Sequence, residues 1–317
     1  MKVIDHLLKA QEPLISFEII PPKRDGEIGG LLAVVEELTQ FHPRFIDVTS
    51  HPAEVYYDET TAGIVRRIKR KRPGTIGICA VIQHKYGIDA VPHVLCQGFT
   101  REETEDFLIE LQYAGIQNAL AVRGDEKGYV KPLPEGKSRN MYAVDLVRQI
   151  HAMNEGKYLT DLLDVKPTGF CIGVGGYPEK HFMAANMKRD VERLREKVDA
   201  GASYIVTQLF YDNAHYFKFV ELCRAEGITV PILPGLKVLS SKKQLEEIAL
   251  TFHVEIPYEL SCAVESAATK EDVVRIGIDW AAKQVEGVLN AKVPAVHFYV
   301  MQKAGYVTEV LKKVGYR

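Results

Sequence analysis

The sequence predicts an α/β fold, and more narrowly a single (β/α)8 TIM barrel that spans residues 1–317. Eight short apolar runs, rich in β-branched residues, alternate with longer segments of helical period. The runs are continuously apolar rather than alternating, which is typical of parallel strands covered on both faces. No repeat or Ser/Gly-rich linker divides the chain, so we expect one domain and no separate regulatory domain.

Four expected strands fall in each half of the chain. Those in the first half cover residues 14–20, 45–50, 75–82 and 118–124. Those in the second half cover residues 169–176, 204–210, 231–236 and 295–300. Eight βα units are the number that a closed barrel needs, although a doubly wound open sheet would give the same alternation.

The segments between the strands carry helix and loop signals. Thr100 with Glu103 three residues later predicts a capped helix start, and Gly115 predicts its end. Further amphipathic helices are expected within 182–200 and 240–253. Two long connections, 124–141 and 153–168, are rich in Gly, Pro and charged residues. Long loops on a compact barrel often carry functional residues.

The composition excludes several classes of partner. Forty basic residues stand against 42 acidic ones without long blocks of either sign, so we expect no nucleic-acid or anionic-membrane partner. No apolar run approaches the roughly 20 residues of a membrane span, and the N-terminus lacks a signal-peptide pattern. Five widely spaced cysteines without a CxxC pair predict buried, reduced thiols. We therefore expect a soluble, cytoplasmic protein.

Polar residues lie at the ends of the expected strands, where barrel enzymes carry their active sites. Glu18 interrupts the apolar run LISFEII, and burial would raise the pKa of its carboxyl and suit it to donate a proton. The alternative is a structural glutamate paired with a basic neighbour such as Lys23. Further polar or aromatic groups at strand ends, which together favour a pocket, are Asp47, Thr49, Asp125, Tyr177, His181, Gln208 and Tyr211.

The sequence lacks the motifs that identify several other classes of enzyme. No GxGxxG follows a strand, so any dinucleotide must be held by barrel loops rather than by a Rossmann turn. There is also no HExxH, GxSxG or Walker A pattern, and no metal site is expected.

Six motifs, in order along nearly the whole chain, resemble the bacterial methylenetetrahydrofolate reductase family. They are SFEIIPPK (16–23), LAVRGD (120–125), GVGGYPEKH (173–181), REKVDAGASYIVTQLFYD (195–212), VPILPGL (230–236) and HFYVMQKA (297–304). The resemblance implies a barrel enzyme with non-covalently bound FAD and NADH or NADPH as co-substrate. It further implies ping-pong reduction of 5,10-methylenetetrahydrofolate at the flavin, a step of one-carbon metabolism and methionine biosynthesis.

The resemblance also implies roles for individual residues. Glu18 matches the family's general acid, Asp125 and Gln208 match substrate-binding residues beside the flavin, and Gln244 and Lys303 match residues at the edge of the substrate cleft. Lys303 would supply a point charge for the folate glutamate tail. FAD contacts are implied for Thr49, His93, Val122, Arg123, Gly124, Asp125, Tyr142, Ala143, Tyr177, His181, Asp190 and Lys197. Of these, Lys197 suits the pyrophosphate and Asp190 the ribose hydroxyls.

Two segments depart from the family pattern. Many members have a Gly-rich stretch resembling YGAGGS after the position of Thr49, whereas residues 50–57 read SHPAEVYY. Bulky residues there would alter backbone contacts with the cofactor and the choice of nicotinamide nucleotide. Ile248 stands where some relatives place an aromatic ring that stacks on the nicotinamide or pterin.

Two other hypotheses stay open at this point. A Schiff-base aldolase would use Lys197, although aldolase lysines emerge from strands and Lys197 is expected in a helix. A catalytically idle barrel that binds a partner is favoured by the altered stretch 50–57. A homo-oligomer is compatible with either hypothesis and with the flavoenzyme.

Overall fold

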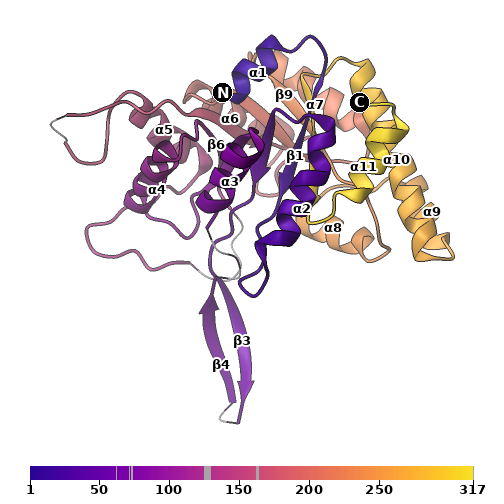
Figure 1. The fold of residues 1–317 in the computed structure, drawn as a ribbon, viewed down its shortest axis with the longest axis horizontal. Coiled ribbons are helices and arrows are strands. Elements are labelled where there is room, and N and C mark those ends of the chain that lie inside the picture. The colour runs from indigo at the N-terminus through magenta and orange to yellow at the C-terminus, as the bar shows by residue number, and fades with distance from the viewer. Residues whose placement is uncertain (62, 71, 73, 125–129, 162–163, 317) are drawn as a thin grey trace.

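Eight parallel strands close into a barrel, which confirms the predicted fold class and rules out the open sheet (Figure 1). The computed structural model describes all residues except 62, 71, 73, 125–129, 162–163 and 317. The barrel strands are β1 (Leu14–Ile19), β2 (Phe45–Val48), β5 (Asp89–Leu95), β6 (Asn118–Val122), β7 (Cys171–Gly176), β8 (Tyr204–Leu209), β9 (Ile232–Leu236) and β10 (Ala295–Met301). Strand β1 pairs with both β2 and β10, and this closes the ring.

Helices surround the barrel and fill the crossovers between parallel strands. They are α1 (Val3–Lys9), α2 (Ile28–Leu38), α3 (Ile76–Tyr86), α4 (Arg101–Tyr113), α5 (Ala143–Asn154), α6 (Met187–Asp199), α7 (Asn213–Ala225), α8 (Gln244–Phe252), α9 (Tyr258–Ser266), α10 (Lys270–Asn290) and α11 (Gly305–Lys313), with a short 3-10 turn η1 (Thr39–Phe41). None of these helices is long and apolar enough to cross a membrane.

The helix signals in the sequence are confirmed. Thr100 and Glu103 form a reciprocal capping box, in which Glu103 N–H donates to Thr100 Oγ1 at 3.1 Å and Thr100 N–H donates to Glu103 Oε2 at 2.8 Å. Gly115 follows α4 with φ of +71°, a conformation that glycine adopts without a Cβ penalty. The five cysteines are unpaired and four of them are buried.

The prediction of a third strand at 75–82 is wrong. This run forms helix α3, and the barrel strand is the following segment, β5. The side chains of Ile78, Cys79 and Ile82 are buried at helical spacing, so one face of α3 packs on the sheet. An eight-residue apolar run does not distinguish a buried strand from a buried helix by periodicity, and Pro92 lowers the strand propensity of the true strand.

Apolar side chains fill the barrel interior, and helix α1 plugs its amino end. Phe45, Leu120 and Tyr204 belong to an interior cluster that also includes Val3 and Leu7 of α1. A larger cluster fills the layer between the sheet and the outer helices. The interior is therefore a packed core, and only the carboxyl end remains for chemistry.

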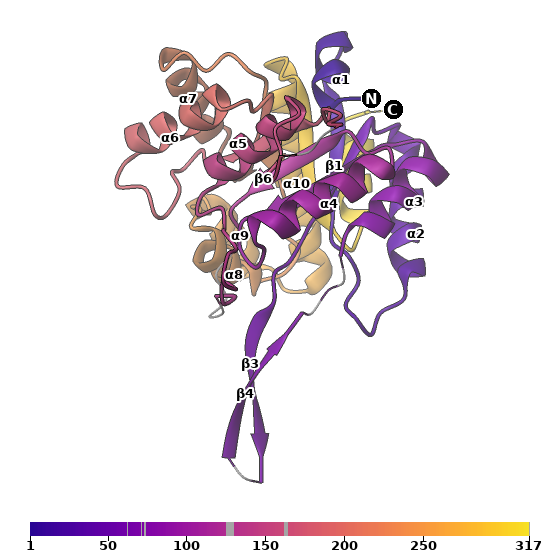
Figure 2. The same cartoon turned by 90° about the vertical axis from the view of Figure 1, so that its left-hand side faces the viewer.

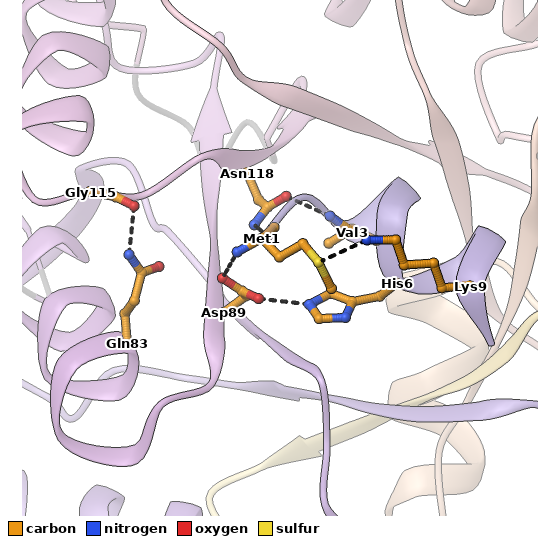
Figure 3. A network of polar contacts seen from close by, with 8 residues as sticks. All are labelled: Met1, Val3, His6, Lys9, Gln83, Asp89, Gly115 and Asn118. Atoms are coloured by element: carbon orange, nitrogen blue, oxygen red, sulfur yellow. Dashed lines mark hydrogen bonds and ion pairs between the residues drawn. The ribbon is translucent and has the colours of Figure 1, made fainter.

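Polar contacts hold the plug in place (Figure 3). The Asp89 carboxylate at the start of β5 pairs with the Met1 ammonium through one oxygen. Its other oxygen lies 2.7 Å from His6 Nε2. Val3 N–H donates to Asn118 Oδ1 at 2.8 Å, and Asn118 Nδ2 donates to Met1 O at 3.1 Å. These contacts join α1 to β5 and β6.

A two-stranded hairpin interrupts the connection between β2 and α3 and projects from the carboxyl end of the barrel (Figures 1 and 2). Its strands, β3 (Glu54–Thr60) and β4 (Gly63–Lys69), pair antiparallel over seven residues each. Tyr57, Ile64 and Ile68 of the hairpin are exposed. The sequence prediction recognised that residues 50–57 are unusual but did not predict this hairpin.

We expect Asp89→Asn to destabilise the fold by about 1 kcal/mol at neutral pH, a small value because the Met1 partner of Asp89 is partly exposed to solvent. Burial raises the pKa of Asp89, but the hydrogen bonds from His6 and the N-terminal ammonium lower it more, so the net shift is downward. Because the pKa of Asp89 in the folded state is lower than the ordinary aspartate value of about 3.9, its ionised carboxylate stabilises the folded protein at pH values above about 3.9. This stabilisation is lost as the pH falls through the folded-state pKa. Thermal unfolding of both proteins from pH 7 to pH 3 measures this.

Asp106→Asn, which removes one carboxylate from the exposed side of α4, is the matched control. The gap in stability between wild type and Asp89→Asn should shrink as the pH falls, whereas the control should stay near wild type. A gap that is constant with pH, or equal for the two variants, would contradict a structural role for the Asp89 pairs.

Candidate active site

Four ionisable side chains converge inside the carboxyl end of the barrel, and we call them the Glu18 cluster: Glu18, Asp47, His93 and His297. All are buried. His93 Nε2 lies 3.3 Å from Glu18 Oε2 and 3.8 Å from Asp47 Oδ1. His297 Nε2 lies 3.8 Å from Glu18 Oε2, and its Nδ1 lies 3.9 Å from Asp47 Oδ2 and 2.9 Å from Ser16 Oγ. Two carboxylates and two imidazoles thus share one apolar enclosure.

Strand alternation and register explain why these side chains meet. Glu18 pairs in register with Asp47 of β2 on one side and with Tyr299 of β10 on the other. Side chains two residues apart along a strand point to the same face, so His297 and Tyr299 both point inward. His93 reaches the same point from β5, the strand beyond β2.

The pKa of the Glu18 carboxyl shifts in the direction opposite to the sequence prediction. Burial raises the pKa of its carboxyl, but the charges of His93, His297 and Lys237 lower it more, so the net shift is downward. The prediction of a raised pKa is therefore wrong, because it considered burial without the histidines. The glutamate does have basic partners, but these are histidines and not Lys23.

His93 shows the complementary shift. Burial lowers the pKa of its imidazole, but Glu18 and Asp47 raise it more, and the net shift is upward. The two shifts have opposite directions, and both favour the form in which His93 carries the proton and Glu18 the negative charge. A buried imidazolium offsets one of the two carboxylates, which limits the cost of burying them.

Tyr299 of β10 pairs in register with Glu18, whereas Gln208 lies on β8, which β9 separates from β10. Tyr299 OH donates to Thr207 O at 2.6 Å, and burial keeps its pKa well above the ordinary value. Gln208, at the end of β8, accepts a hydrogen bond at 2.9 Å from the Leu209 N–H through Oε1. Asp125, for which the resemblance implies substrate and FAD contacts, lies outside the described residues.

A second group, His181, Asp190 and Lys197, lies at the end of β7, and we call it the Lys197 site. Lys197 Nζ donates to Gly175 O at 2.7 Å, and burial lowers its pKa to about 8. His181 N–H donates to Asp190 Oδ2 at 2.8 Å. Burial also lowers the pKa of His181, and the charges of Lys197 and Arg123 lower it further against the effect of Asp190. The site is therefore a concentration of positive charge.

The remaining predicted residues lie at the ends of β2, β6 and β7 or after β9 and β10. Thr49 is buried, and its Oγ1 has no hydrogen-bond partner among the described residues. The Arg123 guanidinium lies 6.0 Å from the centre of the Tyr142 ring. Val122 and Gly124 flank Arg123, Ala143 begins α5, and the Tyr177 ring packs edge-on to His181 at 4.5 Å. Gln244 Oε1 accepts from Ser240 N–H at 2.7 Å, and Lys303 is exposed beside Tyr306.

The sequence prediction missed His297, Lys237 and Tyr299 as members or neighbours of the candidate site. His297 gave a signal of the same kind as Glu18, because it is a polar residue inside an apolar strand. Lys237 directly follows β9, and burial lowers the pKa of its ammonium against the effect of Glu18.

Comparisons with known proteins agree with these features. A family model described as "Methylenetetrahydrofolate reductase" matches residues 3–315. "5,10-methylenetetrahydrofolate reductase" from Buchnera aphidicola is 30% identical over 94% of this chain and 90% of its own length. "Probable methylenetetrahydrofolate reductase (NADPH)" from Caenorhabditis elegans is 29% identical. The chain covers 44% of that protein and 51% of an Arabidopsis thaliana relative named as NADH-dependent, about half the length of each.

One solved structure supports the fold alone. An uncharacterised protein from Clostridium thermocellum, described as binding two copies of 5-methyl-5,6,7,8-tetrahydrofolic acid, superposes with a TM-score of 0.60. The match covers 98% of this chain and 96% of that one, at 14% identity.

We expect His93→Gln to raise the pKa of Glu18, because the substitution removes a positive charge 3.3 Å from its carboxylate while the burial remains. Carbon-13 NMR titration of the Glu18 carboxyl carbon in the purified protein measures this shift. The control is His151→Gln on the exposed side of α5, where the imidazole faces Glu155 at the surface. A Glu18 titration that is identical in wild type and His93→Gln would rule out His93 as the group that holds the carboxyl ionised.

Proposed function

The chain belongs to the methylenetetrahydrofolate reductase family, and on this basis we propose that it reduces 5,10-methylenetetrahydrofolate to 5-methyltetrahydrofolate with electrons from NADH or NADPH. The observation that carries the proposal is the Glu18 cluster, a buried and charged acid–base group at the catalytic end of a barrel. The reaction consumes a proton as well as two electrons, and the cluster would supply that proton.

Glu18 and His93 divide the acid role between them. Because the pKa of Glu18 is lowered and that of His93 is raised, His93 stores the proton and Glu18 passes it to the folate nitrogen released when the five-membered ring opens. His297 orients Glu18 from the opposite side and is itself held by Ser16. Gln208 and Asp125 would bind the pterin, while Gln244 and Lys303 would bind the outer part of the substrate.

The described residues fit a non-covalently bound FAD, which when bound would link the nicotinamide and the folate by two-electron transfer. Lys197 and Arg123 would face the pyrophosphate, and Asp190 the ribose hydroxyls. The buried Thr49 hydroxyl, which has no partner among the described residues, would bond the flavin ring. His93, Val122, Gly124, Asp125, Tyr142, Ala143, Tyr177 and His181 would complete the site.

Curated relatives include proteins named for NADPH and for NADH, so either nucleotide is compatible with family membership. The β3–β4 hairpin stands where many members have a Gly-rich loop, and we propose that it alters how the nicotinamide approaches.

A Schiff-base aldolase is a second candidate, favoured by the pKa of about 8 at Lys197. However, Lys197 arises from helix α6 and donates to a backbone carbonyl. Both features suit a binding lysine better than a nucleophile.

We expect Glu18→Gln to slow folate reduction about 10²–10⁴-fold while leaving flavin reduction by NADH within a few-fold, because only the folate half-reaction needs the proton. Anaerobic stopped-flow absorbance of the flavin measures both half-reactions: bleaching with NADH, then recovery of colour with methylenetetrahydrofolate. Glu259→Gln, an exposed glutamate on α9, is the control. Protein that neither holds FAD nor bleaches would overturn the proposed function, and equal losses in both half-reactions would overturn only the role of Glu18.

We expect FAD affinity to fall as the pH rises from 7 to 9. Since the Lys197 pKa is about 8 and a bound pyrophosphate favours the charged ammonium, binding above pH 8 must take up a proton. The dissociation constant should then rise by up to about tenfold per pH unit above the pKa. Quenching of FAD fluorescence on binding to apoprotein measures it.

Lys197→Met should bind FAD more weakly at pH 7 and lose this pH dependence, whereas Lys188→Met, on the exposed side of the same helix, should retain it. If FAD binding by Lys197→Met keeps the wild-type pH dependence, Lys197 does not bind the pyrophosphate.

A further inference from the structure

The β3–β4 hairpin has two faces of different character. Because side chains alternate along a strand, every second pair of its register lies on the same face. We call the face made by the following pairs the hairpin face: Val55–Ile68, Tyr57–Arg66 and Glu59–Ile64. Tyr57, Ile64 and Ile68 of this face are 67%, 75% and 50% exposed, so large apolar side chains lie in water. Exposed apolar side chains that share one face mark a surface of interaction.

The opposite face of the hairpin is polar, and several of its charged groups have partners. Arg67 Nε lies 2.9 Å from Asp58 Oδ2, and the Lys69 ammonium lies 5.8 Å from the centre of the Tyr56 ring. Val65 on this side is 38% exposed. A polar face with internal ion pairs suits solvent, whereas an apolar face suits burial against another surface.

The hairpin receives little support from the barrel. Among the described strands, β3 and β4 pair only with each other, and all seven residues of β4 are exposed. Figure 2 shows both strands extending away from the barrel. An isolated two-stranded hairpin is marginally stable in water, and packing of an apolar face against another element stabilises it. We therefore expect another surface to cover the hairpin face.

Like charges along each strand disfavour pairing through the hairpin edges. Strand β3 contains three carboxylates and no cation, and β4 contains three cations and no carboxylate. Two copies that joined β3 to β3, or β4 to β4, would place like charges opposite each other. Joining β3 to β4 would leave an edge open and continue into a filament. The hairpin face is the surface that remains for a closed contact.

Two opposite charges lie on the hairpin face. Glu59 is near the tip and Arg66 near the middle, and neither belongs to an ion pair that the described residues form. In a contact with twofold symmetry the same patch meets itself, so Glu59 of each copy can reach Arg66 of the other. The hairpin face is therefore apolar and complementary to itself in charge.

We propose that the hairpin face binds the hairpin face of a second copy of this chain. The two hairpins pack antiparallel with their barrels at opposite ends, because packed sheets lie about 10 Å apart and two barrels do not fit side by side at that spacing. The tip of each hairpin then lies over the middle of the other. This places Glu59 over Tyr57 of the second copy and beside its Arg66. The contact is independent of the chemistry at the Glu18 cluster.

The size of the hairpin face sets the strength of the contact. Two strands of seven residues present a face of roughly 250 Å². A standard protein–protein interface buries about 800 Å² per partner. The dimer is therefore transient, with a dissociation constant on the order of 10–100 μM.

Sedimentation velocity over protein concentrations on both sides of that constant measures the dimer. Ile64→Ser should weaken it about tenfold or more, because the symmetry removes this side chain from both copies. Val65→Ser, the neighbouring position on the opposite face, is the matched control and should dimerise like wild type. Both positions are exposed, so thermal unfolding of the barrel should be unchanged. Wild type that stays monomeric throughout, or equal dimerisation by the two variants, would overturn the proposal.

A charge exchange tests which residues meet across the contact. Glu59→Arg and Arg66→Glu should each weaken the dimer about tenfold, because each places like charges across both symmetric contacts. An equimolar mixture of the two variants should form a heterodimer of near wild-type affinity, since every such pair between the chains is then opposite in charge. Each variant has like charges within its own hairpin, so only contact between copies explains the recovery. A mixture that associates as weakly as either variant alone would overturn the proposal.

Discussion

The burial of ionisable groups at one end of a closed barrel is the constraint on which the rest of the structure depends. Glu18 and Asp47 are adjacent buried carboxylates at the carboxyl end of an interior whose other end is a packed apolar core. They are tolerated because His93 and His297 approach within 3.3–3.9 Å from β5 and β10. Removing one partner of such a buried pair typically costs about 3–5 kcal/mol, because the other charge is left uncompensated. The acid–base group therefore assembles only when β1 closes the barrel by pairing with both β2 and β10.

The two ends of the barrel differ in how they accommodate charged side chains. At the amino end, α1 covers the core, and Asp89, His6 and the Met1 ammonium neutralise one another near the surface. At the carboxyl end, the polar side chains of the Glu18 cluster emerge from β1, β2, β5 and β10. Water therefore screens the ion pairs at the amino end. At the carboxyl end, neighbouring charges shift the pKa values of Glu18 and His93, and burial lowers that of Lys197.

The sequence predicted what depends on local pattern and missed what depends on partners distant in the chain. Seven of the eight strands were placed because continuous apolar runs are a local signal. The run at 75–82 was misassigned because α3 is buried by tertiary packing, which periodicity over eight residues does not reveal. The predicted pKa direction of Glu18 failed for the same reason. Burial is visible in the sequence around it, whereas His297, 279 residues later, becomes its neighbour only when β1 and β10 pair.

The β3–β4 hairpin meets the barrel at a root that contacts the loops after β1 and β5. Its strands project into solvent, so any influence on the site must pass through its root. There Pro52 packs so closely on Gly98 that a Cβ at Gly98 would lie 2.9 Å from the proline ring, and Arg72 donates to the Pro21 carbonyl beyond β1. The root is thus tied to the loops that follow β1 and β5, the strands that carry Glu18 and His93. These contacts fix the root against the strands that carry Glu18 and His93, while β3 and β4 themselves lie outside the barrel.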